Sequence, residues 1–264
     1  MIAERFSLRG QSVVITGAST GIGRAAAIAC AEMGAQILVA ARSADKLAEL
    51  VDDIAATGGT AFACAADLSD KQETLQMFDE AEARMGRIDG VIANAGSDGM
   101  KTPLVDLPDE VFEQLLDLNL KSVFWSLKRV LPAMIERRSG SVVITGSIGS
   151  ERGLPMTSGY NATKHAVLGL MRSASAEVAR HNVRVNCVLP GLIHTPMLDG
   201  LADMFGEGDR EQGLAKLGAM VPQGRVGQPE ELASAAAFLL SGAASYINGH
   251  ALAVDGGVLA SIGS

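Results

Sequence analysis

The sequence has few cysteines, and their spacing is not that of a metal site or a disulfide framework. Cys30, Cys64 and Cys187 lie far apart and form no C-x-x-C pair. The four histidines are equally dispersed along the chain: His165, His181, His194 and His250. We therefore expect three buried structural thiols and no bound metal.

The sequence also lacks long hydrophobic runs and clusters of basic residues. No run approaches the roughly 18 apolar residues of a membrane-spanning helix, and residues 1–10 lack the basic-then-apolar order of a signal peptide. The net charge is −8 and the pI about 5.0, which argues against a nucleic-acid surface. These features predict a cytoplasmic protein that binds small molecules and neither nucleic acid nor membranes.

Short apolar runs alternate with amphipathic stretches along the whole chain. The expected strands are Val13–Ile15, Gln36–Ala40, Ala61–Ala65, Ile88–Ala93, Ser141–Thr145, Val183–Val188 and Ala251–Val254. The expected helices are Ile22–Met33, Ala44–Ala56, Lys71–Met85, Asp109–Arg138, Ser158–Arg180 and Pro229–Ser241. Strands that are apolar throughout are typical of a parallel sheet covered on both faces. The pattern predicts an α/β fold with a doubly wound, seven-stranded parallel sheet, as one domain over residues 1–264.

The alternation is interrupted only at residues 197–225, which contain glycines, methionines and other apolar residues. We expect an irregular insertion that serves as a short lid over a substrate site. Gly200, Gly206 and Gly208 could let this lid open and close.

Glycines at the end of the first strand indicate a phosphate-binding turn. Gly17, Gly21 and Gly23 are spaced G-x-x-x-G-x-G, and a helix is expected to begin at once. Such glycines permit a tight turn and close approach of a pyrophosphate to the helix N-terminus. After the second strand, Ala41 stands where a carboxylate would bind a ribose diol, and Arg42 follows it. A guanidinium at this place favours the 2′-phosphate of NADP(H) over NAD(H).

Polar residues follow the later strands and are candidates for the rest of the site. Asp67 could accept from an adenine amino group, and Asn94 is either a ligand-binding or a turn residue. Ser147 follows the fifth strand, and Tyr160 and Lys164 share one helix face. A neighbouring ammonium favours the phenolate, so Tyr160 could exchange a proton with a substrate oxygen to which Ser147 donates a hydrogen bond.

Together these features resemble the short-chain dehydrogenase/reductase family over residues 7–257. The residues that carry the resemblance are Thr16, Gly17, Gly21, Gly23, Asp67, Asn94, Ala95, Gly96, Asn119, Ser147, Tyr160, Lys164, Pro190, Gly191, Thr195, Asp255, Gly256 and Gly257. The resemblance implies a Rossmann fold and an NAD(P)-dependent enzyme acting on CH–OH or C=O groups. It implies that Asn119 holds a water next to Lys164, which binds the nicotinamide ribose, and that Ile193 or Thr195 seats the carboxamide.

The complete expected site has a catalytic and a cofactor-binding part. The catalytic residues are Asn119, Ser147, Tyr160 and Lys164. The cofactor-binding residues are Gly17, Ser19, Thr20, Gly21, Ile22, Gly23, Arg42, Asp67, Leu68, Asn94, Ala95, Gly96, Tyr160, Lys164, Pro190, Gly191, Ile193 and Thr195.

The neighbourhood of the expected hydride position is mainly apolar. The residues concerned are Leu154, Met156, Leu192, Ile193, Met197, Leu198, Leu201, Met204 and Phe205. They favour an apolar ketone or secondary alcohol over a sugar or a free carboxylate.

Three other functions stay open. A 3-oxoacyl-thioester reductase would need a basic surface to dock an acyl carrier protein, to which Arg129, Arg137, Arg138 and Arg172 could contribute. An isomerase or dehydratase that uses the same cofactor is a further alternative. A non-catalytic NADP-binding protein is disfavoured because all four catalytic residues are present.

The helices at Asp109–Arg138 and Ser158–Arg180 carry more apolar residues than one sheet-facing stripe requires. These residues are Val111, Phe112, Leu115, Leu116, Val167, Leu168 and Leu170. Surplus apolar surface is typical of an interface, and the family resemblance implies a homotetramer of dihedral symmetry.

Overall fold

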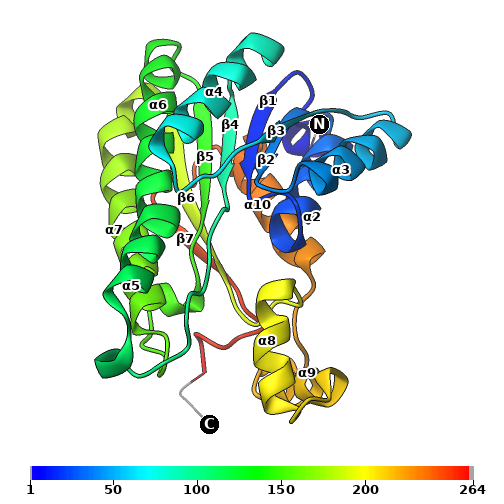
Figure 1. Cartoon of the computed structure of the whole chain (residues 1–264). Coiled ribbons are helices and arrows are strands. Elements are labelled where there is room, and N and C mark those ends of the chain that lie inside the picture. Colours follow the sequence, from blue (N-terminus) through cyan, green and yellow to red (C-terminus); the bar gives the residue numbers. More distant parts are fainter. Residues whose placement is uncertain (1, 262–264) are drawn as a thin grey trace.

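The computed structural model describes residues 2–261 and contains a seven-stranded sheet with helices on both faces (Figure 1). The strands are β1 (Ser12–Thr16), β2 (Gln36–Ala41), β3 (Thr60–Ala65), β4 (Gly90–Ala93), β5 (Gly140–Thr145), β6 (Val183–Pro190) and β7 (Ala251–Val254). The longer helices are α2 (Gly21–Glu32), α3 (Ala44–Ala56), α4 (Lys71–Met85), α5 (Asp109–Leu115), α6 (Ser122–Glu136), α7 (Ser158–Val178), α8 (Pro196–Phe205), α9 (Arg210–Ala219) and α10 (Pro229–Leu240). The short elements are α1 (Ile2–Phe6), η1 (Leu104–Asp106), η2 (Leu116–Lys121), η3 (Ile148–Ser150), η4 (Ala179–His181) and η5 (Gly242–Ala244).

The predicted fold is confirmed. The strands pair in parallel in the order β3-β2-β1-β4-β5-β6-β7. From β1 the chain adds β2 and β3 towards one edge of the sheet. It then returns to the middle, where β4 pairs with β1, and adds β5, β6 and β7 towards the other edge. This reversal creates a crevice at the carboxyl ends of β1 and β4, the place where open α/β sheets bind ligands.

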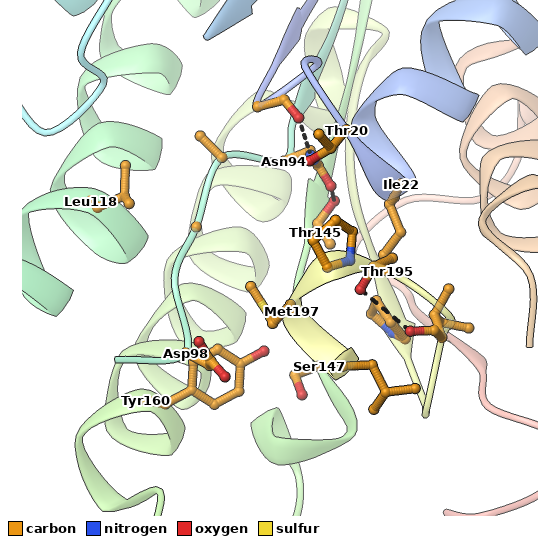
Figure 2. A pocket seen from close by; sticks show the side chains of 18 of the residues that line it. Thr20, Ile22, Asn94, Asp98, Leu118, Thr145, Ser147, Tyr160, Thr195 and Met197 are labelled. Atoms are coloured by element: carbon orange, nitrogen blue, oxygen red, sulfur yellow. Dashed lines mark hydrogen bonds between the residues drawn. The ribbon is translucent and has the colours of Figure 1, made fainter. Parts of the chain in front are cut away.

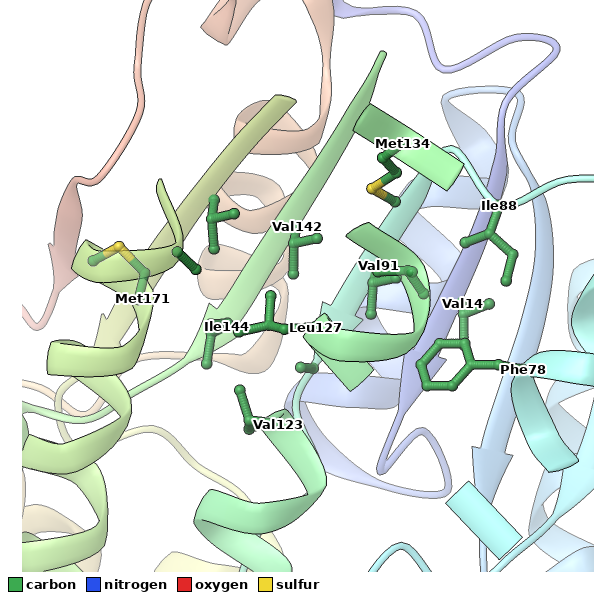
Figure 3. Close-up of a cluster of buried hydrophobic side chains, with 14 of the residues drawn as sticks. Val14, Phe78, Ile88, Val91, Val123, Leu127, Met134, Val142, Ile144 and Met171 are labelled. Atoms are coloured by element: carbon green, nitrogen blue, oxygen red, sulfur yellow. The ribbon is translucent and has the colours of Figure 1, made fainter. Parts of the chain in front are cut away.

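Two apolar cores fill the space between the sheet and its helices. One contains residues of α4, α6 and α7, among them Phe78 and Met134, packed against Val91 and Val142 of the sheet (Figure 3). The other packs α2, α3 and α10 against the opposite face. Both faces of the central strands are therefore buried, which is why their sequences are apolar without alternation. The three cysteines are buried as expected.

One predicted helix is interrupted at a functionally placed residue. The expected helix Asp109–Arg138 is formed by α5 and α6 with the π-helical segment η2 between them. The wider turn of η2 contains Asn119, which is 1% exposed. Interruptions of this kind are frequent at functional sites, and apolar periodicity does not reveal them.

The insertion at residues 197–225 is largely helical, because α8 and α9 make up most of it, so the expectation of an irregular segment is wrong. Arg210 of α9 bridges to Asp199 and Asp203 of α8 and fixes the two helices together. A Cβ on Gly206 would lie 1.7 Å from the carbonyl oxygen of Asp209, so this glycine serves a tight turn between the helices. The helical pair lies below the carboxyl edge of the sheet (Figure 1). If the segment moves, it moves as one unit.

Candidate active site

A cleft of about 420 Å³ opens at the carboxyl ends of the strands and extends to α8. All of the expected catalytic and cofactor-binding residues line it except Gly23 and Asn119, which lie behind its wall. The residues that the sequence did not assign to the site include Ala41, Ser43, Ala66, Asp98, Lys101, Leu118, Thr145, Gly146, Ile148, Thr157 and Pro196. Within residues 2–261 no group of side chains could hold a metal ion, and no helix is long and apolar enough to cross a membrane.

The turn between β1 and α2 needs its glycines for close backbone contact. Gly17 has a φ of 66°, and a Cβ there would lie 2.8 Å from Cα of Ala95. A Cβ on Gly23 would lie 2.2 Å from the carbonyl oxygen of Gly17. Thr20, the N-cap of α2, makes no side-chain cap hydrogen bond, so the first N–H groups of the helix face the cleft without that partner. This cradle fits the pyrophosphate of a dinucleotide.

Asn94 joins three strands at the bottom of the cleft. Its Nδ2 donates to the carbonyl oxygens of Thr16 and Gly17 at 3.1 and 3.3 Å, and its Oδ1 accepts from Thr145 at 3.2 Å (Figure 2). The backbone N–H groups of Asn94 and Ala95 both donate to Oγ1 of Thr16 at 3.0 Å. Asn94 is therefore more than a turn residue, since it holds the crevice between β1 and β4 in shape.

Arg42 and Asp67 lie at the far end of the cleft, after β2 and β3. Arg42 forms no ion pair with any residue between 2 and 261, so its guanidinium is available to a ligand. Oδ1 of Asp67 accepts from the backbone N–H and the hydroxyl of Ser69 at 2.9 and 2.7 Å. These hydrogen bonds, and more weakly the charge of Arg42, lower the pKa of Asp67, which keeps it an ionised acceptor.

Tyr160 and Ser147 meet at the inner end of the cleft (Figure 2). Burial raises the pKa of the Tyr160 phenol, while its hydrogen bond with Ser147 acts in the opposite direction. The expected lowering of the Tyr160 pKa is therefore not found, because burial has the largest effect on it. Tyr160 is therefore a protonated hydroxyl at neutral pH, the form required of an acid. Oγ of Ser147 is itself fixed, because it accepts from the N–H of Gly149 at 3.0 Å.

Lys164 lies one helical turn beyond Tyr160 and is 5% exposed. Its Nζ donates to the carbonyl oxygen of Thr145 at 2.7 Å and lies 5.7 Å from the centre of the Tyr160 ring. Burial without a carboxylate partner lowers the pKa of Lys164 to about 8. The lysine is thus charged at pH 7, with donors left for a ligand in the cleft.

Asn119 organises the loop that follows β4. Its Oδ1 accepts from the N–H of Ser97 at 2.9 Å, and its Nδ2 donates to the carbonyl oxygen of Ser97 at 2.8 Å and to Thr163 at 3.1 Å. The resemblance assigned Asn119 to a water near Lys164. Its contacts add a role that the sequence did not suggest, because both backbone groups of Ser97 are held by one side chain.

The substrate end of the cleft is only partly the one expected. Leu154, Leu192, Met197, Leu198 and Leu201 line it. Ile193 lines it as well. Three residues expected in the apolar wall do not line the cleft: Met156, Met204 and Phe205. Met204 is 60% exposed, although it shares a face of α8 with Met197 and Leu201, because it lies about two turns further along, near the end of the helix.

Asp98 and Lys101, which sequence reasoning missed, lie in the same wall. The available signal was a pair of opposite charges three residues apart, just after the Asn94-Ala95-Gly96 run at a strand's carboxyl end.

Residues 17–259 match the family described as Enoyl-(Acyl carrier protein) reductase. The chain is 37% identical over 255 residues to 2,5-dichloro-2,5-cyclohexadiene-1,4-diol dehydrogenase of Sphingobium indicum, covering 96% of this chain and 98% of that protein. It is 34% identical to the 3-oxoacyl-[acyl-carrier-protein] reductase of Thermotoga maritima, covering 96% of this chain and 99% of the relative.

Solved structures agree with the sequence relatives. The crystal structure of levodione reductase superposes with a TM-score of 0.92 at 34% identity, covering 96% of this chain and 99% of the other. A candidate NAD(P)-dependent gluconate 5-dehydrogenase of Beutenbergia cavernae, crystallised with NADP at low occupancy, gives a TM-score of 0.89 at 37% identity. The superposition covers 97% of this chain and 100% of that one.

Proposed function

Because this chain belongs to the short-chain dehydrogenase/reductase family, whose members are NAD(P)-dependent enzymes acting on CH–OH or C=O groups, we propose that it links NADP(H) to an apolar ketone or secondary alcohol. Tyr160 is the general acid in reduction and the general base in oxidation. The whole chain acts as one dinucleotide-binding domain, with α8 and α9 as a lid over the cleft.

The observation that carries the proposal is the meeting of Ser147, Tyr160 and Lys164 at the end of a cleft whose outer wall is apolar. When bound, the nicotinamide supplies or accepts the hydride. The Tyr160 hydroxyl donates its proton to the carbonyl oxygen, which also accepts a hydrogen bond from Ser147 as negative charge develops. Lys164 adds a positive charge near the phenol and favours the tyrosinate that remains.

The preference for NADP(H) rests on residues 41 and 42. Ala41 offers no carboxylate to bind a ribose diol or to repel a phosphate, and the Arg42 side chain has no ion-pair partner among the described residues. A 2′-phosphate at this end of the cleft would give Arg42 a charged partner.

Reduction of a 3-oxoacyl thioester is the second candidate, and similarity to the Thermotoga maritima enzyme favours it. All four arginines considered for docking an acyl carrier have a partner within the chain, since Arg172 lies 3.7 Å from the carboxylate of Glu151. Arg129 is bridged to Asp79 and Glu82, while Arg137 and Arg138 donate to the carbonyl oxygens of Ile88 and Arg180. Arg137 and Arg138 also follow α6, at the amino edge of the sheet and opposite the cleft.

Assembly into a homotetramer stays part of the proposal on revised grounds. Leu115, Val167 and Leu168 were expected at an interface, but they are buried within the chain itself. The surface of α6 instead exposes Phe124, which is 45% accessible. Light scattering at micromolar concentration tests the proposal, and a stable monomer would refute it.

The functional proposal is tested by measuring oxidation of NADPH and NADH with cyclic ketones, diketones, steroids, 3-oxoacyl thioesters and free keto acids. We expect the highest kcat/KM with NADPH and a neutral cyclic or medium-chain ketone. A thioester far superior to every ketone would favour the second candidate. Preference for an anionic substrate would contradict the apolar pocket.

A further inference from the structure

The substrate end of the cleft contains one ion pair in an otherwise apolar wall. Five charged residues line the described cleft: Arg42, Asp67, Asp98, Lys101 and Lys164. Arg42 and Asp67 lie at the ends of β2 and β3, and Lys164 is bound to Thr145 behind Tyr160. Only Asp98 and Lys101 are left to face a substrate.

Asp98 lies beside the reacting group. Figure 2 shows its carboxylate next to the ring of Tyr160. The two side chains also interact electrostatically: after burial, the negative charge of Asp98 is what raises the pKa of Tyr160. A substrate whose carbonyl oxygen reaches Tyr160 therefore brings its neighbouring atoms close to this carboxylate.

The carboxylate has hydrogen-bonding capacity to spare. Nζ of Lys101 lies 3.0 Å from Oδ2 of Asp98, and both side chains are 28% exposed, which leaves them open to a ligand. The other oxygen, Oδ1, accepts no hydrogen bond from any residue between 2 and 261. When an apolar substrate displaces water from the cleft, this oxygen needs a new donor.

The loop that holds Asp98 is fixed on both sides. Ser97 is bound through both backbone groups by Asn119. Gly99 has a φ of 65° and donates its N–H to Oγ of Ser97 at 3.1 Å. Further along, the N–H of Thr102 donates to the carbonyl oxygen of Met156 at 2.9 Å. A charged group that is held in place before the ligand arrives can discriminate between ligands.

We infer that Asp98, supported by Lys101, is a specificity-determining residue that accepts a hydrogen bond from a hydroxyl group of the substrate. The inference rests on the proposed function and narrows it: the preferred substrate is an apolar ketone that also carries a neutral hydroxyl group. A plain ketone leaves Oδ1 of Asp98 unpaired, and a free carboxylate is repelled by it. A hydroxyl group donates to an ionised acceptor, which is among the stronger hydrogen bonds in proteins.

The test compares kcat/KM for cyclohexanone with kcat/KM for its 2-, 3- and 4-hydroxy derivatives, with NADPH. The ratio of each hydroxy ketone to cyclohexanone cancels any effect of a variant that both substrates share, including a change at Tyr160. Asp98→Ala is the informative variant. Asp106→Ala is the matched control, since it removes the same charge from an exposed position in η1, the short helix that follows the loop, outside the cleft.

We expect the wild-type ratio to reach about 10 to 100 for at least one isomer. It should fall to near one in Asp98→Ala and stay at its wild-type value in Asp106→Ala. The inference is overturned if no isomer exceeds cyclohexanone, or if Asp98→Ala keeps the wild-type ratio.

Failure of the proposed function is a different result, in which none of these ketones is reduced. Calorimetric binding of cyclohexanol and the cyclohexanediols to the protein with NADP then judges the subsite without turnover. Tighter binding of a diol that is lost in Asp98→Ala supports the subsite, and equal binding overturns it.

Discussion

The two ends of the cleft differ in what forms their walls. At the cofactor end, between β1 and β4, the wall consists of backbone and small residues in contact, such as Gly17 against Ala95. At the substrate end, next to α8, it consists of long side chains on loops and short helices, such as Met197 and Lys101. The first end tolerates almost no added atom, whereas the second can exchange side chains without moving the backbone. Changes at one end should therefore leave the function of the other intact.

The largest effect is expected where the two ends meet. Tyr160→Phe deletes a hydroxyl without changing the cofactor end, so kcat should fall about 10²- to 10⁴-fold while NADPH affinity stays near normal. Turnover and fluorescence titration of NADPH on the same sample measure both quantities. A variant with more than a tenth of wild-type kcat would show that another group transfers the proton.

Lys164→Met, at the place where the two ends meet, should change stability and activity in opposite directions. Burial sets the pKa of Lys164 to about 8 in the folded protein, against 10.5 for an ordinary lysine. Between these pH values Lys164 binds more protons in the unfolded chain than in the folded one, so this residue alone should raise the unfolding free energy of the wild type relative to the Met variant by about 3 kcal/mol from pH 8 to 10.5.

The Met variant should lack this rise, be more stable than the wild type at pH 7 and lose turnover. Denaturant unfolding of both proteins at several pH values gives the difference. If the unfolding free energies of the two proteins changed with pH in the same way, burial would not lower the pKa of Lys164.

Arg42→Ala tests the cofactor end alone. It should weaken NADPH binding about 10- to 150-fold, with little effect on NADH or on KM for the ketone, because it removes a charge-assisted contact to the 2′-phosphate. Ala41→Asp should shift the preference towards NADH. Lys46→Ala, an exposed charge outside the cleft, serves as the control. Equal losses for both cofactors would rule out the assignment of Arg42.

The smallest effect is expected at the substrate end. Replacing Met197 and Leu201 by Ser should raise KM for apolar ketones about 10-fold without changing NADPH affinity, since both residues line the cleft. The matched control replaces Met204 and Phe205, which lie on the same helix outside the lining. If replacing Met204 and Phe205 had the larger effect, these two residues, rather than Met197 and Leu201, would contact the substrate.

The difference between a cofactor end made of backbone and a substrate end made of side chains also explains what could be predicted from the sequence. The seven strands and the glycine turn were predictable because apolar runs and glycine spacing are local features that backbone geometry requires. The segment η2 was not, because a π-helical turn leaves no mark on apolar periodicity. The helical form of α8 and α9 was missed because the glycines within residues 197–225 are typical of a loop.

At the site, Tyr160 and Lys164 were recognisable from their spacing on one helix face. Asp98 and Lys101 were not, because a charged pair in a loop is usually solvated, and the contacts that fix this loop, such as those of Asn119 with Ser97, join residues far apart in the sequence. Met204 and Phe205 were assigned to the pocket wrongly, since composition does not reveal that α8 carries them past the cleft to its far end.

The central claim is that Tyr160 moves the proton, and pH–rate profiles in both directions test it most directly. Ketone reduction should fall at high pH as Tyr160 loses its proton, and alcohol oxidation should fall at low pH as Tyr160 gains one. In Tyr160→Phe the residual activity should lose the inflection that the two wild-type profiles share. An inflection of the same position and size in the Phe variant would assign the proton transfer to another group.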